Sequence, residues 1–455
     1  MNAKYFMHMC ALVGGLCLSV APVARPGQES AATAQGEPAN AKQQASAPLR
    51  LTLQDALDRA RKNSTQFQAA LTNAGIARED KAQARDALLP TVNYNNQVLY
   101  TQSNGAGGVR YIANNAVHEY ISQGNIHEVI DIAGVANFRR ASATAAIARA
   151  EAEIASRGLV VTVVQNYYNA AAAQQKLEAA KKTSEEGERF LKLTQQLEDG
   201  GEVAHSDVIK AELQMQERRR QLQEAQLGLL NARLDLAVLI FPDFNDNFDL
   251  ADDLHANPAL PTLGEVQQQA ARDNPEVRAA LASVQAAGND VTGARAGYLP
   301  SLSLDYFYGI DAARFATNTD GVSNLGSSAI ASLNIPIWNW GATQSKVKQA
   351  ELRQAQAKRE LSLSQRKLLA EIRSLYAEAE TSLNELGGLS RSAELAAESL
   401  RLTTLRYKDG EATVLEVVDA QTTFAQANAA YHDGAVRYRV ALANLQTLTG
   451  VLTSP

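Results

Sequence analysis

Glu416 and Asp419 are the two residues whose types and spacing most suggest chemistry. They lie three residues apart in a stretch with helical periodicity, so their carboxylates share one helix face. An ordinary solvated face is one interpretation, because like charges at this spacing repel only mildly in water. The other is a charge site. In a symmetric assembly each acid becomes a ring of acids, and such rings give a pore a preference for cations.

Catalytic chemistry is not indicated elsewhere in the chain. The sequence contains no G-x-S-x-G, no phosphate-binding loop, no H-E-x-x-H and no paired cysteines. The histidines after the first 24 residues are scattered without the spacing of metal ligands. We therefore expect no enzyme activity, no metal and no cofactor. These histidines are His118, His127, His205, His255 and His432.

The first residues predict export. Residues 1–24 have the features of a signal peptide, with Lys4 ahead of an apolar run and small residues near its end. Residues 25–48 are rich in Ala, Gln, Gly and Pro and predict a flexible linker. Both cysteines, Cys10 and Cys17, lie in the signal segment, and Cys17 lacks the small preceding residue of a lipoprotein site. We expect a mature chain without disulfides or lipid.

Composition restricts the class of protein. Aromatic residues make up only 6% of the chain, and the formal net charge is −6. Abundant Ala, Gln, Leu, Glu and Arg are typical of long helices and coiled coils. The acidic balance argues against a nucleic-acid partner, which would demand a basic face.

The chain contains an internal duplication. Residues 53–90 align without a gap with residues 263–300, at an offset of 210, and about eleven of the 38 aligned positions are identical. Both copies end in an Arg followed by Leu-Pro. A repeat of this length is a whole supersecondary unit, so the fold consists of two copies of one design.

Each copy predicts a helix, two strands, a long helix and a further helix. In the first copy one helix is expected over 52–88 and strands over 91–100 and 117–131. In the second, strands are expected near 301–308 and over 328–337. Several of these strands alternate polar and apolar residues, which favours a wet lumen on one side and lipid on the other. Four aromatic residues near the strand ends predict an interfacial girdle: Tyr100, Tyr111, Trp338 and Trp340.

The long helices are expected over about 135–198 and 342–406, each ending in a glycine turn before an antiparallel partner. Heptad spacing of large side chains predicts coiled coils. A helix of about 65 residues spans roughly 100 Å. Four strands per chain are too few to close a barrel, whereas three subunits would supply twelve. The fold class is therefore mainly α with β: a trimeric 12-stranded β-barrel continuous with a coiled-coil α-barrel.

The duplication also predicts the domain boundaries. The first repeat is expected over 49–241 and the second over 262–450. Residues 242–261 form a linker between them that does not repeat, and residues 451–455 form a C-terminal tail.

The ordered motifs resemble the TolC-like outer membrane efflux proteins. The resemblance is carried by the Arg and Leu-Pro endings, by the stretch 335–341 (Ile-Pro-Ile-Trp-Asn-Trp-Gly), and by Tyr407-Lys408-Asp409-Gly410 followed by 416–421 (Glu-Val-Val-Asp-Ala-Gln). It covers about residues 50–450. It implies a passive homotrimeric channel-tunnel, gated at its periplasmic end, that serves a tripartite efflux pump or a type I secretion system.

The resemblance also implies roles for particular residues. Glu416 and Asp419 match the acids of the family's pore constriction. A gate network matches Tyr407, Ser206 and Asp207, and Ala412 stands where some members carry an Arg. The partners implied are a periplasmic adaptor and an inner-membrane pump. Three glycines of the helix turns are expected to mark the adaptor-docking site: Gly200, Gly201 and Gly410.

A periplasmic coiled-coil adaptor is the alternative function, since it too would be exported and helical. The two strand pairs and the full-length duplication favour the channel. The expected location is the outer membrane, in contact with its lipid, with an extension into the periplasm.

Overall fold

The computed structural model describes residues 49–100, 118–243, 248–251, 254, 258–319 and 321–452. The predicted signal peptide (1–24) and flexible linker (25–48) lie outside these residues, as does Tyr111.

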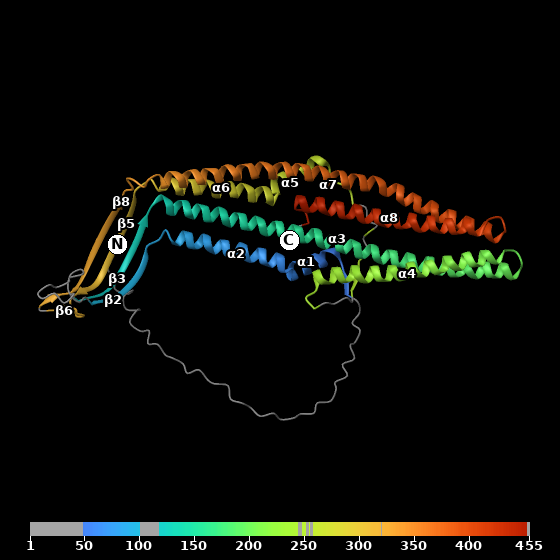
Figure 1. Cartoon of the computed structure of the whole chain (residues 1–455), viewed down its shortest axis with the longest axis horizontal. Coiled ribbons are helices and arrows are strands. Elements are labelled where there is room, and N and C mark those ends of the chain that lie inside the picture. The colour runs from blue at the N-terminus through green and yellow to red at the C-terminus, as the bar shows by residue number, and fades with distance from the viewer. Residues whose placement is uncertain are drawn as a thin grey trace, which may run out of the picture. The chain divides into compact units, whose positions relative to one another are not determined.

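Both repeats share the order of two helices, a strand pair, a long helix and a shorter helix, and the second repeat adds short strands at Asn318–Thr319 and Val322–Ser323 (Figure 1). The first helix pair recurs at the predicted offset of 210, since Leu53–Asn63 corresponds to Leu263–Asp273 and Thr65–Asp86 to Pro275–Ala296. The elements are β1 (Leu49–Leu51), α1 (Leu53–Asn63), α2 (Thr65–Asp86), β2 (Thr91–Tyr100), β3 (His118–Ile130), α3 (Ile132–Asp199), α4 (His205–Ile240), β4 (Phe248–Leu250), α5 (Leu263–Asp273), α6 (Pro275–Ala296), β5 (Ser301–Ala312), β6 (Asn318–Thr319), β7 (Val322–Ser323), β8 (Leu325–Asn334), α7 (Ala342–Lys408) and α8 (Val414–Thr449).

The single helix predicted over 52–88 is wrong, because it is two helices that meet at Ser64. The Ser64 N–H still donates to the Ala60 carbonyl at 2.8 Å, which ends α1. Its hydroxyl then accepts from the Phe67 N–H at 3.2 Å and so caps α2. In the second repeat Asn274 caps α6 in the same way, and Pro275 takes the first helical position, where its missing N–H costs nothing.

Two long helices organise the packing. α3 has 68 residues and α7 has 67, so each spans about 100 Å at the rise of an α-helix. α1, α2 and α4 pack along α3, while α5, α6 and α8 pack along α7. α3 also contacts α6 and α8, which joins the two repeats (Figure 1). Shorter helices thus pack along one long helix in each repeat.

A four-stranded antiparallel sheet has the order β2-β3-β5-β8. β3, expected over 117–131, pairs along most of its length with both neighbours. β8 ends at Asn334 instead of Ile337, three residues earlier than predicted. β2 and β8 are the edges of this sheet, and nearly all their residues are exposed.

The register separates a largely apolar face from a largely polar one, since directly paired residues point to the same side. The apolar face also carries polar residues, among them Asn96 and Glu128, whose Oε2 is buried without a hydrogen-bond partner among the described residues. The side-chain oxygen of Asn96 accepts from the Ser122 hydroxyl at 2.7 Å, and Ser122 also bonds the Tyr94 hydroxyl at 2.8 Å. The amide oxygen of Asn96 is therefore satisfied. The apolar face includes Val92, Tyr94, Val98, Ile126, Leu302, Leu304, Tyr306, Tyr308 and Leu333; the polar face includes Asn93, Asn95, Gln97, Gln123, His127, Ser303, Asp305, Ser328 and Ser332.

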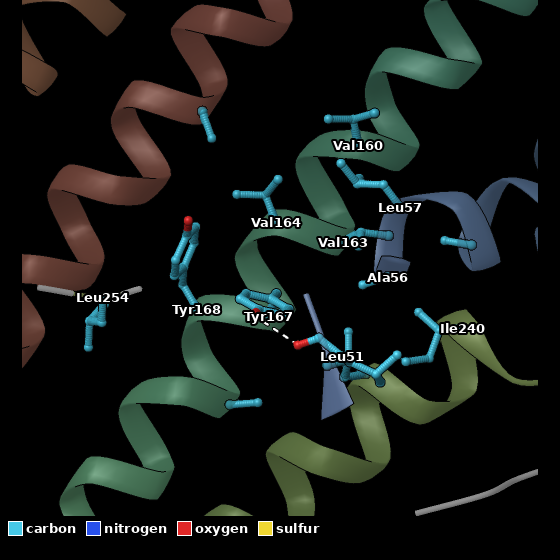
Figure 2. Packing of buried hydrophobic residues seen from close by; sticks show 14 of the residues in the cluster. Leu51, Ala56, Leu57, Val160, Val163, Val164, Tyr167, Tyr168, Ile240 and Leu254 are labelled. Carbon is cyan, nitrogen blue, oxygen red and sulfur yellow. Dashed lines mark hydrogen bonds between the residues drawn. The ribbon is translucent and has the colours of Figure 1, made fainter. Parts of the chain in front are cut away.

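The main hydrophobic core lies where α1, α3 and α4 meet the strand β1 (Figure 2). We call it the belt cluster; its buried residues include Leu51, Leu57, Val160, Val164, Tyr167, Leu236, Ile240, Phe248 and Leu254. The Tyr167 hydroxyl donates to the Leu51 carbonyl at 3.3 Å and to the Ala251 carbonyl at 2.8 Å.

The linker expected between the repeats over 242–261 contains a short strand. β4 (Phe248–Leu250) lies inside it and pairs in parallel with β1 (Leu49–Leu51). Phe248 and Leu254 are fully buried in the belt cluster. Three-residue strands are too short to show a period in the sequence, so only their tertiary contacts reveal them.

Candidate functional site at the helix turns

Two glycine turns join the long helices to their partners, α3 to α4 and α7 to α8. Gly201 has φ +76° and Gly410 has φ +74°, the left-handed conformation that glycine adopts without steric cost. Each is followed by a backbone bond that closes the helix end, from Glu202 N–H to Leu197 O and from Glu411 N–H to Arg406 O, both at 2.8 Å. Gly200 has φ −76°, a conformation that other residues also adopt, so this position does not require a glycine.

The two turns are held together by an apolar cluster, which we call the turn cluster. It consists of Phe190 on α3, Ala211 on α4, Tyr407 on α7, and Val414 and Val417 on α8, all buried. The rings of Phe190 and Tyr407 lie 5.3 Å apart at an angle of 53°. The ends of both hairpins are thus packed against one another within a single chain.

Tyr407, predicted for the gate network, is 3% exposed. Its hydroxyl donates to the Thr194 hydroxyl on α3 at 3.4 Å, and Thr194 donates in turn to the Phe190 carbonyl at 3.0 Å. Burial raises the pKa of Tyr407; the bond with Thr194 opposes this rise, and the charge of Asp207 adds to it. The tyrosine is therefore a neutral hydrogen-bond donor at physiological pH.

The other two predicted members of the gate network lie in the first turn of α4. Asp207 is close enough to influence Tyr407 electrostatically, but its carboxylate pairs with Lys210 at 3.1 Å. Ser206 is exposed. Within one chain the hydroxyl of Tyr407 thus bonds Thr194 and not Ser206 or Asp207.

Glu416 has a local structural role that sequence reasoning missed. It forms a capping box with Thr413: the Thr413 N–H donates to its carboxylate at 3.1 Å, and its own N–H donates to the Thr413 hydroxyl at 3.3 Å. These bonds from Thr413, backbone first, hold the pKa of the Glu416 carboxyl below its ordinary range, and Arg406 contributes. The Thr-x-x-Glu spacing was the available signal.

Arg406 is a second residue that was missed. Its guanidinium lies 3.5 Å from the Glu416 carboxylate and donates to the Glu411 carbonyl at 3.0 Å. It thereby supplies a cation to the turn in which Ala412 stands at the family's arginine position. Ala412 itself packs against the turn cluster.

Asp419 differs from Glu416 in its surroundings. It lies one turn further along α8 and is exposed. Val417 and Gln421, on the opposite side of this turn, are buried. The helix face that carries both acids therefore points away from the packing of its own chain, and Asp419 brings the less compensated charge.

Two of the predicted interfacial aromatics, Trp338 and Trp340, form an elbow between β8 and α7. The rings of Trp338 and Trp340 lie 5.8 Å apart, edge to face, and are 74% and 89% exposed. Trp340 has φ +54° and Gly341 φ +83°, so the backbone turns sharply before α7 begins. Tyr100, at the end of β2, is also largely exposed.

Two histidines that looked isolated in the sequence have acidic partners. His127 on β3 lies 2.8 Å from Asp305 on β5, on the polar face of the sheet. His205 lies 2.7 Å from Glu198, beside the first turn. In the part of the chain that the structure describes, no group of three or more His, Cys, Asp or Glu residues could hold a metal ion. Among the described residues, none of the helices combines the length and apolar character of a membrane span.

Comparison with known proteins gives a consistent result. The outer membrane efflux protein family matches over residues 56–240 and 266–451, once in each repeat. The chain is 24% identical to the outer membrane protein TolC of Vibrio cholerae, over 88% of this chain and 91% of that protein. It is 23% identical to the alkaline protease secretion protein AprF of Pseudomonas aeruginosa, over 88% and 85%.

Solved structures share the fold. The Campylobacter jejuni CmeC outer membrane channel superposes with a TM-score of 0.77 at 19% identity, over 88% of this chain and 85% of that one. At this identity the likeness concerns the fold, including the helix-strand-strand-helix-helix plan of each repeat.

Proposed function

The chain belongs to the outer membrane efflux protein family, and from this premise we propose that three copies form one continuous exit duct. The protein is an outer membrane channel with a periplasmic extension. Like the family and its relatives, it is a passive channel and not an enzyme. The adaptor alternative is not supported, because the relatives are outer membrane channels of efflux and secretion systems.

The observation that carries the trimer is the four-stranded sheet with two opposed faces and two unpaired edges. Edge strands expose rows of unpaired backbone N–H and C=O groups and invite further pairing. Because the four strands alternate in direction, β8 of one copy can pair antiparallel with β2 of the next. Two copies would supply eight strands, and side chains fill the interior of an eight-stranded barrel. Three copies supply twelve and leave room for a lumen.

The polarity of the sheet sets its orientation. The face with Asn93, Asn95, Gln97 and Ser303 turns toward the lumen, and the face with Val92, Tyr94, Leu304 and Tyr306 toward lipid. The Trp338 and Trp340 elbow then lies at the boundary between lipid and periplasm, where amphipathic rings are favoured.

The periplasmic end of the duct is the pair of turns. We place Glu416 and Asp419 at its constriction, since their shared face is free of packing within the chain. Tyr407, Ser206 and Asp207 form the gate network around the turn cluster. The turns at Gly200, Gly201 and Gly410 dock a periplasmic adaptor, which connects the duct to an inner-membrane pump.

The domain plan accompanies this proposal. A signal peptide (1–24) and a linker (25–48) precede the first repeat (49–241), and a linker (242–261) separates it from the second (262–450).

Native mass spectrometry of the full-length protein in detergent tests the assembly. We expect three copies per particle, and single-channel conductance once these particles are inserted into planar bilayers. A monomer that stays soluble without detergent, or a particle of two copies, would contradict the proposal.

A further inference from the structure

A pocket of about 330 Å³ lies where α3, α6, α7 and α8 meet, beside the break between α5 and α6. It is far along the helices from the turn cluster and plays no part in the duct proposed above. The polar residues of its walls include Arg157, Glu276, Glu371 and Asn444.

Arg157 forms one wall and is 9% exposed. One of its terminal nitrogens donates to the Leu448 carbonyl at 2.7 Å, and the other to the Asp273 carbonyl and the Glu153 carboxylate, each at 2.9 Å. The guanidinium thus caps the C-terminal ends of α5 and α8. Its Nε–H is buried and has no hydrogen-bond partner.

Asn444 has an acceptor without a donor, whereas Arg157 has a donor without an acceptor. The side-chain oxygen of Asn444 is buried without a hydrogen-bond partner. A buried acceptor left unpaired costs about 1–3 kcal/mol, so the pocket holds one orphan donor and one orphan acceptor.

Two carboxylates line the same pocket. Glu276 lies in the first turn of α6 and Glu371 on α7, and both keep contact with solvent. Loss of water on the pocket side raises the pKa of Glu371, and the neighbouring charge of Glu276 raises it further. In the described part of the chain, the ion pairs of this region join Glu153 to Arg157 and Arg278 and leave these two acids uncompensated.

The repeat fold does not require acidic residues at the positions of Glu276 and Glu371. At the offset of 210, the positions that correspond to Glu276 and Glu371 are Gln66 and Val161. The first repeat builds the same helices without either acid. The acid pair is therefore a feature of one half only, not a requirement of the architecture.

We propose that this pocket binds a small molecule in which a primary ammonium group stands next to a hydrogen-bond acceptor, the chemistry of an amino acid or an amino alcohol. An ammonium has three N–H donors, and the pocket offers three acceptors in Glu276, Glu371 and Asn444. The adjoining oxygen of the ligand accepts the free Nε–H of Arg157. A metal ion fits less well, since it would leave this donor unpaired beside the cationic guanidinium.

The ligand arm of the test uses the unmodified full-length protein in detergent. Isothermal titration calorimetry compares glycine with glycine betaine, which keeps the carboxylate but has no N–H donors. Glycine should bind about tenfold or more tightly than betaine, because hydrogen bonds to charged groups are lost. Propylamine, which lacks the acceptor, should also bind more weakly than glycine. Ethanolamine then separates the two ligand sources: binding of glycine alone assigns an amino acid, and binding of ethanolamine alone an amino alcohol.

The protein arm uses Glu371→Gln and, on a different helix, Asn444→Leu. Each should weaken glycine binding about tenfold, while circular dichroism and trimer content stay unchanged. Glu380→Gln, an exposed acid on the same helix α7, is the matched control and should bind normally. Equal binding of glycine and betaine, no binding of either glycine or ethanolamine, or unchanged affinity in both variants would overturn the proposal. Binding of Mg²⁺ to the unmodified protein that is lost in these variants would also overturn it.

Discussion

At the scale of single residues, the two acids proposed for the constriction are not equivalent. The carboxylate of Glu416 is engaged by Thr413 and lies near Arg406, whereas Asp419 is exposed without such compensation. A charge that is already balanced by a cation a few ångströms away projects a weaker field into a lumen. The pore field should therefore depend mainly on Asp419.

The corresponding prediction concerns ion selectivity. Asp419→Asn should lower the cation-to-anion permeability ratio in planar bilayers by up to about fivefold, the factor for the ~1 kcal/mol that a unit charge exerts at 4 Å in water. Glu416→Gln, which keeps the cap, should change it less. The control is trimer content, which should be unaffected. Equal effects of the two substitutions would show that the compensation by Arg406 does not matter in the assembled pore.

The residues of the turns could be found from the sequence only in part. The glycine turns and the acids were recognisable from their motifs. Thr194 and Arg406 were not, because their partners lie on other segments: Tyr407 is 213 positions from Thr194, and Arg406 reaches Glu416 across a turn. Side-chain partners of this kind depend on tertiary packing, which no local pattern records.

At the scale of elements, the glycine turns differ in what they require of glycine. Gly201 and Gly410 have positive φ, and Gly200 does not. Outside glycine the left-handed conformation costs about 1–3 kcal/mol. A methyl group at Gly200 would meet only ordinary contacts, the nearest being the Leu197 carbonyl at 3.5 Å.

We therefore predict that Gly410→Ala loosens the α7–α8 turn and Gly200→Ala does not loosen the α3–α4 turn. Hydrogen exchange should report this directly, with the Glu411 amide losing about one order of magnitude of protection in Gly410→Ala. The Glu202 amide should keep its protection in Gly200→Ala. Loss of protection in both variants would mean that docking of the turns, not backbone conformation, limits exchange.

The first turns of α4 and α8 show another difference between the repeats. α8 begins with a capping box, whereas Ala204 at the start of α4 makes no side-chain cap. Ala204 already has the extended backbone of a capping residue, and Asp207 stands three positions later, as Glu416 does after Thr413.

Ala204→Ser should accordingly stabilise the start of α4 by roughly 1 kcal/mol, the usual worth of such a cap. The reciprocal change, Thr413→Ala, should destabilise α8 by a similar amount. Thermal denaturation of the purified trimer measures both. If the serine gives no increase in midpoint, the α4 terminus is limited by the turn cluster and not by its free N–H groups.

Most elements could be predicted from the sequence, because the helical period in α3 and α7 and the two-residue period in β2 continue over long, regular stretches. The break at Ser64 was missed because serine also occurs inside helices, and its capping role appears only from its bonds. In the second repeat the pair Asn274-Pro275 indicates the same break directly, because proline favours the first position of a helix. Comparison of the two copies would have corrected the first.

At the scale of the whole molecule, the chain carries its own reporter of membrane position. It has two tryptophans, Trp338 and Trp340, and both lie in the exposed elbow between β8 and α7. All indole fluorescence therefore originates at one level of the protein. Under the proposed orientation this level is the boundary between lipid and periplasm.

In vesicles, lipids brominated near the headgroup should quench this fluorescence strongly, and lipids brominated at the chain ends only weakly. Trp338→Phe and Trp340→Phe separate the two contributions and keep an aromatic ring at each site. Strong quenching from the chain ends would instead place the elbow deep in the bilayer, which would contradict the orientation of the sheet.

The belt cluster brings together three distant parts of the chain. Leu51 near the start of the described chain, Leu452 at its end, and Phe248 between the halves all pack in this cluster, and Arg61 donates to the Leu452 carbonyl at 3.3 Å. Beginning, middle and end thus converge at one level. A rearranged gene that encoded the second half before the first would keep the helix and strand pairings within each half. It would alter only the connections at this level, so the packing of this cluster does not by itself require the first half to precede the second.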